Sequence, residues 1–143
     1  MPRRTDIDPV DIPHLLPHIM LLAVDRDGPP RFRVQLVGSA VIGYRANLAD
    51  ANPTGRWLDE MGMVSDPGEN LELCQRATED GLPRYTSSAC RPAGDQMPEG
   101  IMHRIVLPLT VGSTRVDMLL CGIDRAISWS SMRPAPVPAA LSV

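Results

Sequence analysis

Fifteen prolines, most of them in three clusters, divide this 143-residue sequence into short blocks. Proline ends a helix because it lacks a backbone N–H and clashes with the preceding turn, so each block is read separately. The apolar content of 43% is enough to bury the core of one compact domain. With one Phe, two Trp and two Tyr, that core has to consist of Val, Ile, Leu, Met and Ala.

The first block predicts two short helical turns. Asp8 followed by Pro9 supplies an N-cap and then a φ angle preset for a helix, and Asp11 stands three residues later, close to a reciprocal capping arrangement. Pro17 should end the second turn. The apolar face of these turns is expected to consist of Ile12, Leu15, Leu16 and Ile19.

The next blocks predict a hairpin. The run 19–25 is short and apolar, and it ends at the turn signal 27–30, which favours a buried strand. The run 32–37 alternates, with Phe32, Val34 and Leu36 on one face.

The sequence after residue 38 predicts several short helices followed by three strands. Ser39 is expected to cap a short helix over 40–45, and Asp66-Pro67 to begin a longer helix that ends at Gly81. A brief helical element is predicted over 54–60, strands are predicted at 84–91, 103–110 and 115–123, and a polar loop is predicted over 91–100. Strands and helices that are segregated along the chain indicate an α+β fold with an antiparallel sheet and helices on one face.

The local sequence resembles a PAS domain of a small stand-alone bacterial type. The opening phrase, from Arg3-Arg4 through Asp-Ile-Asp-Pro-Val-Asp-Ile-Pro to His18, carries most of the resemblance. Weaker matches follow at 32–39, 54–60, 107–109 and 117–120, so the resemblance covers about residues 3–125. Ala46 stands where the family has a glycine, and 49–53 resembles an insertion, so the entrance to the family's pocket is expected to differ.

The resemblance implies a five-stranded antiparallel sheet of order 2-1-5-4-3 whose concave face, closed by short helices, forms a ligand cavity. The expected organisation is an N-terminal helical cap over 1–18, a PAS-like domain over 19–125 and a proline-rich flexible tail over 126–143. The predicted cavity lining comes from inward positions of the sheet and the short helices. These positions are Leu36, Val41, Ile42, Tyr44, Arg45, Trp57, Leu58, Tyr85, Ser87, Leu107 and Met118. The alternative is that they simply fill the core.

Familiar cofactors do not fit the sequence. His14, His18 and His103 lie outside 39–82, where a haem-binding PAS domain carries its axial ligand, and no flavin-type cysteine phrase occurs around Cys74, so haem and flavin are disfavoured. The three cysteines are widely spaced and lack the Cys-x-x-Cys pattern of a zinc site. His14 and His18 have a spacing that can bind metal on a helix, but Pro17 lies between them and interrupts the helix. No metal site is therefore predicted.

Charge, hydropathy and motif content exclude several classes of partner and function from the expectation. The net charge of −3 is scattered along the chain, so a nucleic-acid partner is not expected. The chain lacks an apolar span and a secretory signal, so a cytoplasmic protein is expected. No nucleophile with its base, phosphate loop or carboxylate pair stands out, so an enzyme is not expected.

The predicted function is a stand-alone PAS-type sensory module that binds an unknown small molecule and signals through a homodimer or a protein partner. The alternative is an interaction adaptor with a filled cavity and no ligand. The predicted interface in either case is the N-terminal apolar set Ile12, Leu15, Leu16 and Ile19.

Overall fold

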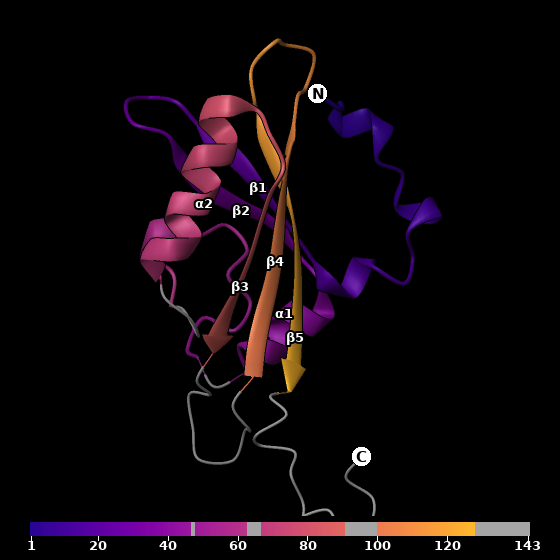
Figure 1. Cartoon of the computed structure of the whole chain (residues 1–143), viewed down its shortest axis with the longest axis vertical. Helices are drawn as coiled ribbons and strands as arrows, with labels where there is room; N and C mark the ends of the chain where they lie inside the picture. Colours follow the sequence, from indigo (N-terminus) through magenta and orange to yellow (C-terminus); the bar gives the residue numbers. More distant parts are fainter. Residues whose placement is uncertain (47, 63–66, 91–99, 128–143) are drawn as a thin grey trace, which may run out of the picture.

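The computed structural model describes residues 1–46, 48–62, 67–90 and 100–127. One five-stranded antiparallel sheet of order β2-β1-β5-β4-β3 organises the fold, which confirms the predicted α+β class and strand order. The strands are β1 (Ile19–Asp25), β2 (Arg31–Val37), β3 (Arg84–Cys90), β4 (Gly100–Leu109) and β5 (Met118–Ile127). The chain crosses from one half of the sheet to the other between β2 and β3, so the first and last strands pair at its centre (Figure 1).

The helices lie on one face of the sheet, which we call the inner face. They are α1 (Ser39–Tyr44) and α2 (Pro67–Asp80), and α2 runs beside β3 and β4 (Figure 1). Thr86 of β3 donates a hydrogen bond of 2.7 Å to Glu69 of α2, which fixes which face β3 turns toward the helix. Alternate residues of the strands therefore pack under the helices.

The main core lies between the inner face and the helices. It joins Leu22, Phe32 and Val34 of the first hairpin to Val106, Leu119 and Cys121 of the central strands. Val41 of α1 and Cys74 of α2 complete it from the helical side. Most of its members are branched aliphatic side chains, as the low aromatic content requires.

The opposite, outer face of the sheet is covered in part by the N-terminal segment (residues 1–18). This segment contains three 3₁₀ turns, Arg4–Asp6, Pro9–Asp11 and Leu16–His18, and passes on the side of the sheet away from α2 (Figure 1). Local hydrogen bonds hold the turns, because Asp8 accepts from the N–H of Val10 at 3.0 Å and Asp6 accepts from the N–H of Arg3 at 2.8 Å. Asp8 thus caps a turn as predicted, but Asp11 ends that turn and does not cap it.

The structure corrects several predicted elements. Ile19 lies in β1 and is not part of a helical face. The segment 54–60 is helical only at Leu58–Glu60, and the N-cap of α1 is Gly38. The last two strands are shifted relative to their predicted ranges, and β5 extends to Ile127, past the expected domain boundary at 125. Of the predicted loop 91–100, Gly100 begins β4, and of the predicted tail 126–143, the first two residues belong to β5; residues 91–99 and 128–143 lie outside the described residues.

A β-bulge explains one further difference. The pairing of β1 with β2 shifts between Leu21 and Leu22, so Leu22 faces Val34 while Leu21 faces Leu36. Because an extra residue reverses the side-chain alternation, Phe32 and Val34 are buried in the core but Leu36 emerges on the outer face. The prediction that all three share one face was wrong.

Gly38 packs directly against the backbone of the N-terminal segment, so we expect Gly38→Ala to be strongly destabilising. A Cβ there would lie 2.3 Å from the carbonyl oxygens of Leu16 and Pro17. The cost should be about 2 kcal/mol or more in urea unfolding, since backbone atoms have to move. Gly43→Ala, which meets nothing within 4 Å in the same helix, should be neutral or stabilising. Equal effects of the two changes would contradict this packing.

Candidate functional site

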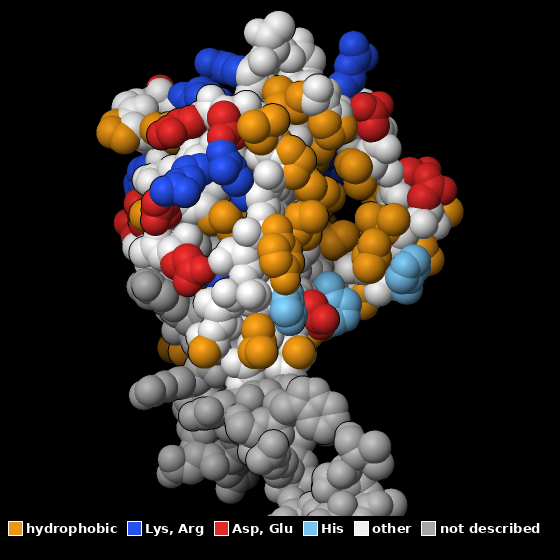
Figure 2. Space-filling model, viewed as in Figure 1, with side chains coloured by type: hydrophobic (Ala, Val, Ile, Leu, Met, Phe, Trp, Pro, Cys, Tyr) orange, Lys and Arg blue, Asp and Glu red, His pale blue; other side chains and the backbone are white. Residues whose placement is uncertain are grey.

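The outer face is apolar across the central strands, like the inner face. Leu21, Leu109 and Met118 form a second buried cluster there, and Ile7 of the N-terminal segment packs against it. Beyond this contact the face is open to solvent: Ile105 and Ile101 of β4 are 41% and 39% exposed. In Figure 2 the apolar side chains form a continuous area beside the N-terminal segment, with a hollow between the two.

The hollow consists of two adjoining cavities that share wall residues, which we together call the outer groove. One has a volume of about 360 Å³ and lies over β4 and β5, where Ile105, Leu107, Leu120 and Gly122 line it. The other has a volume of about 300 Å³ and lies toward β2, where Leu36, Val37 and Gly38 line it. Both cavities share the side chains of Ile7, Ile12, Ile19 and Leu120. The groove therefore crosses the sheet from β2 to β4.

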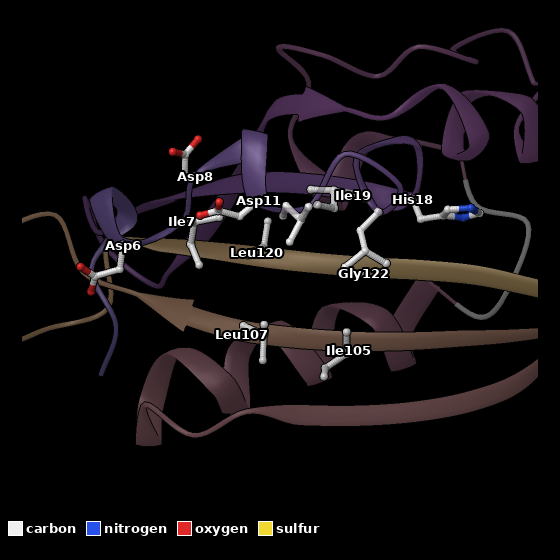
Figure 3. A pocket seen from close by; sticks show the side chains of 12 residues that line it. Asp6, Ile7, Asp8, Asp11, His18, Ile19, Ile105, Leu107, Leu120 and Gly122 are labelled. Atoms are coloured by element: carbon white, nitrogen blue, oxygen red, sulfur yellow. The ribbon is translucent and has the colours of Figure 1, made fainter.

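Gly122 deepens the floor of the groove. It stands on the outer face of β5 next to Leu120, and a Cβ added there would come within 2.8 Å of the Ile105 Cγ2 methyl. Figure 3 shows Ile7 and Leu120 facing one another across the cavity, while the carboxylates of Asp6 and Asp8 point away from it. The floor is thus made of aliphatic side chains, while the larger cavity is also lined by Asp6, Asp8, Asp11 and His18.

The N-terminal segment is tied to the sheet at its two ends. At the first end, the N–H of Thr110 donates to the Pro2 carbonyl at 3.0 Å and the N–H of Arg4 donates to the Thr110 carbonyl at 2.8 Å. At the second end, the chain enters β1 at Ile19, where the N–H of Gly38 donates to the Ile19 carbonyl. Between these ties the segment spans the groove as a strap.

A row of polar side chains crosses the outer face at the end of the groove. The His18 ring is 3.3 Å from the Tyr44 hydroxyl, which in turn donates to Asp124 at 3.5 Å. On the adjoining strands, the Tyr85 hydroxyl lies 2.8 Å from Nδ1 of His103, which pairs in register with Asp124. Burial raises the pKa of Tyr44, and the nearby Asp124 carboxylate raises it too, so this phenol stays protonated at neutral pH.

The predicted lining residues are divided between the two faces of the sheet. Leu36 and Leu107 line the outer groove, and Met118 belongs to the outer cluster beside it. Tyr85 and Ser87 are also on the outer face but beyond the groove, since they alternate with Thr86 along β3. Val41, Leu58 and the half-buried Tyr44 pack with the main core, and Ile42 is a half-buried position of α1. The eleven residues therefore do not form one cavity.

Arg45 and Trp57 have structural surroundings. The Arg45 guanidinium pairs with Asp50 at 2.9 Å and donates to the carbonyls of Gly62, Asp50 and Ala51. Burial lowers its pKa, which the Asp50 carboxylate opposes. Trp57 lies under the guanidinium of Arg31, 4.3 Å from the ring centroid, so a cation–π contact occupies its face.

The predicted interface residues line the groove. Ile12 and Ile19 contact both cavities, Leu15 contacts the first and Leu16 the second. Leu15 is 47% exposed, whereas Ile19 is buried. The sequence analysis missed Arg4, Ile7, Ile105, Leu120 and Gly122. Its available signal was the run Met118 to Cys121, which is apolar at every position and so predicts a strand covered on both faces.

Searches for metal sites and membrane spans gave negative results. Among residues 1–46, 48–62, 67–90 and 100–127, no three His, Cys, Asp or Glu side chains are grouped closely enough to hold a metal ion. In that same part of the chain, no helix has the length and apolar character needed to cross a bilayer. No protein-family model, curated protein or solved structure matches the sequence or the fold.

The buried ion pair allows a test of the role of Arg45. Asp50→Ala leaves the guanidinium buried without its carboxylate, so we expect a loss of about 3–5 kcal/mol in the free energy of unfolding. Asp59→Ala breaks the exposed pair with Arg31 and should cost about 1 kcal/mol or less. Urea titrations of both variants measure the difference. A loss at Asp50 no larger than that at Asp59 would show that the Arg45 clamp is not structural.

The loop that ties the strap should depend on pH through Asp117. Hydrogen bonds from the N–H of Val111 and from Ser113 and Thr110 lower the pKa of this carboxyl group. Its stabilisation is therefore present above the unfolded pKa of about 3.9 and is lost as the pH falls through the lower folded value.

We accordingly expect Asp117→Asn to be about 1 kcal/mol less stable than the wild type at pH 7. The difference should shrink as the pH falls through the lowered pKa of Asp117 and vanish below it, where both side chains are neutral. Stability curves over this pH range measure the effect, and a difference that does not change with pH would contradict it.

Proposed function

We propose that this protein is a PAS-type sensory module that binds a small apolar molecule in the outer groove and passes the signal on by protein contact. The observation that carries the proposal is a pair of adjoining, mainly aliphatic cavities under a strap that is tied at both ends. Apolar surface in such a hollow gains free energy when a ligand displaces its water.

The sheet supports the PAS part of the proposal. A five-stranded antiparallel sheet of order β2-β1-β5-β4-β3, with helices on one face, is the arrangement that the sequence resemblance implies. The proposed binding place differs from the family's, because the described inner-face residues near α1 and α2 form the packed core. The ligand is placed on the outer face for this reason.

The strap supplies a route from ligand to partner. Ile7 and Ile12 line the groove on one side and belong to the exposed N-terminal turns on the other. A ligand that fills the groove has to contact both, so it changes the position or the mobility of the strap. Such a change alters the surface offered to another protein without moving the sheet.

The adaptor alternative has an observation of its own. Tyr85 is 64% exposed opposite Ile105, and the exposed Ile101 lies further along β4, so the apolar face continues past the groove. Exposed apolar area of this kind is common at protein interfaces. In this alternative the groove stays without a ligand and the outer face holds the partner directly.

Native mass spectrometry of the purified protein, with a denatured control, tests the proposal. We expect an extra mass that denaturation releases and that Gly122→Val abolishes, since its methyl groups fill the groove floor. Ala89→Val, an exposed outer-face change outside the groove, should keep the ligand. If Gly122→Val fails to fold, Leu15→Ser provides a second test: Leu15 is an exposed residue at the edge of the groove, and its loss should weaken ligand binding. A wild type that carries no extra mass and forms a complex through Tyr85 and Ile105 would favour the adaptor.

A further inference from the structure

The outer groove contains one arginine whose charge no acidic group balances. Arg4 lines the cavity toward β2, among aliphatic side chains that include Ile7, Leu36 and Leu109. Its side chain is half-buried, and Nη1 donates a 3.3 Å hydrogen bond to the carbonyl oxygen of Ile7. No carboxylate in the described part of the chain forms an ion pair with it.

Other arginines of this protein form ion pairs with carboxylates. Arg31 binds two carboxylates, Arg45 is paired with Asp50, and Arg84 is paired with Asp80. A half-buried guanidinium in aliphatic surroundings has lost part of its hydration and has donors to spare. Its natural complement is a carboxylate, which a guanidinium can bind through two parallel hydrogen bonds.

Asp6 and Asp8, the acidic side chains closest to Arg4 in sequence, do not fill this role, and Asp11 forms no ion pair with Arg4 either. Asp6 accepts a hydrogen bond from the N–H of Arg3, and Asp8 accepts one from the N–H of Val10, so both are used in capping the strap. Their carboxylates point away from the groove in Figure 3. Because these carboxylates are exposed, salt screens the effect of their charge beyond about 8 Å at physiological ionic strength.

The rest of the groove suits an aliphatic chain. The cavity that Arg4 lines adjoins the larger cavity at Ile12 and Leu120, which line both, and Leu107 and Gly122 form the floor of the larger one. Four neighbouring strands, β2, β1, β5 and β4, contribute to this path, which is about 14 Å across the sheet at the usual strand spacing. Among the described residues that line the groove there is no Phe, Tyr or Trp ring on which a planar cofactor could stack, and the aromatic side chain there is that of His18, at the end of the larger cavity.

We propose that the outer groove binds a medium- or long-chain aliphatic carboxylate, with its head on Arg4 and its tail over Leu120 and Gly122. This inference rests on the proposed function, because it names the ligand class of the same groove. Arg4 is also hydrogen-bonded through its N–H to Thr110, so the head group would sit where the strap is tied. A bound carboxylate would thereby act on the anchored end of the strap.

The test compares three twelve-carbon probes by isothermal titration calorimetry, below their micelle-forming concentrations and at neutral pH. The probes are dodecanoate, dodecanol and dodecyltrimethylammonium, which share a tail and differ in head charge. Arg4→Gln removes the charge but keeps an amide that can donate to Ile7. Arg3→Gln is the matched control, since Arg3 is the neighbouring exposed arginine and lines neither cavity.

We expect dodecanoate to bind most tightly and Arg4→Gln to weaken it roughly ten-fold, the usual size of a charged hydrogen bond. The same change should leave dodecanol unaffected, and Arg3→Gln should leave all three probes unaffected. Equal affinities for the three heads, or equal losses in both variants, would overturn the carboxylate assignment. The groove itself would still stand if Gly122→Val blocked the tails. Failure of every probe to bind would instead remove the proposed function.

Discussion

The fold depends on the pairing of β1 with β5 at the centre of the sheet. Both strands are apolar at consecutive positions, as in Leu21-Leu22 and Leu119-Leu120, so each presents apolar side chains to both faces. Water would be in contact with one of these faces if only helices covered the sheet. The helices bury Leu22 and Leu119, and the N-terminal segment is left to cover Leu21 and Leu120.

The N-terminal segment covers that face incompletely, and the reason is local. Its 3₁₀ turns are capped by Asp6 and Asp8, and its prolines restrict the chain between them. These constraints allow Ile7 to contact the outer cluster but hold the remaining length away from the sheet. Gly122 adds to the gap by offering no side chain from below. A groove between a stiff strap and an apolar floor is the result, and it is where a ligand gains most from burial.

The sequence predicted the sheet well because its strands carry strong local signals. The β1 run is bounded by a turn, and β2 alternates until its bulge. The predicted site was less accurate, because the face of the sheet on which a side chain lies depends on features that alternation alone does not reveal. The bulge near Leu21 turned Leu36 outward, and the buried partner of Arg45 lies in a loop whose path no local pattern fixes. The outer groove was not predicted, because the sequence of the N-terminal segment does not indicate which face of the sheet the segment covers.

A ligand site on the outer face of the sheet can be located by methyl NMR spectroscopy during a titration with dodecanoate. We expect shifts confined to groove methyl groups such as those of Ile7, Ile105 and Leu120, which line the cavities. The methyl groups of Leu22, Val34 and Leu119 in the main core should remain unchanged. Shifts concentrated in that core, with the groove signals unmoved, would place the ligand between the sheet and the helices and contradict the account.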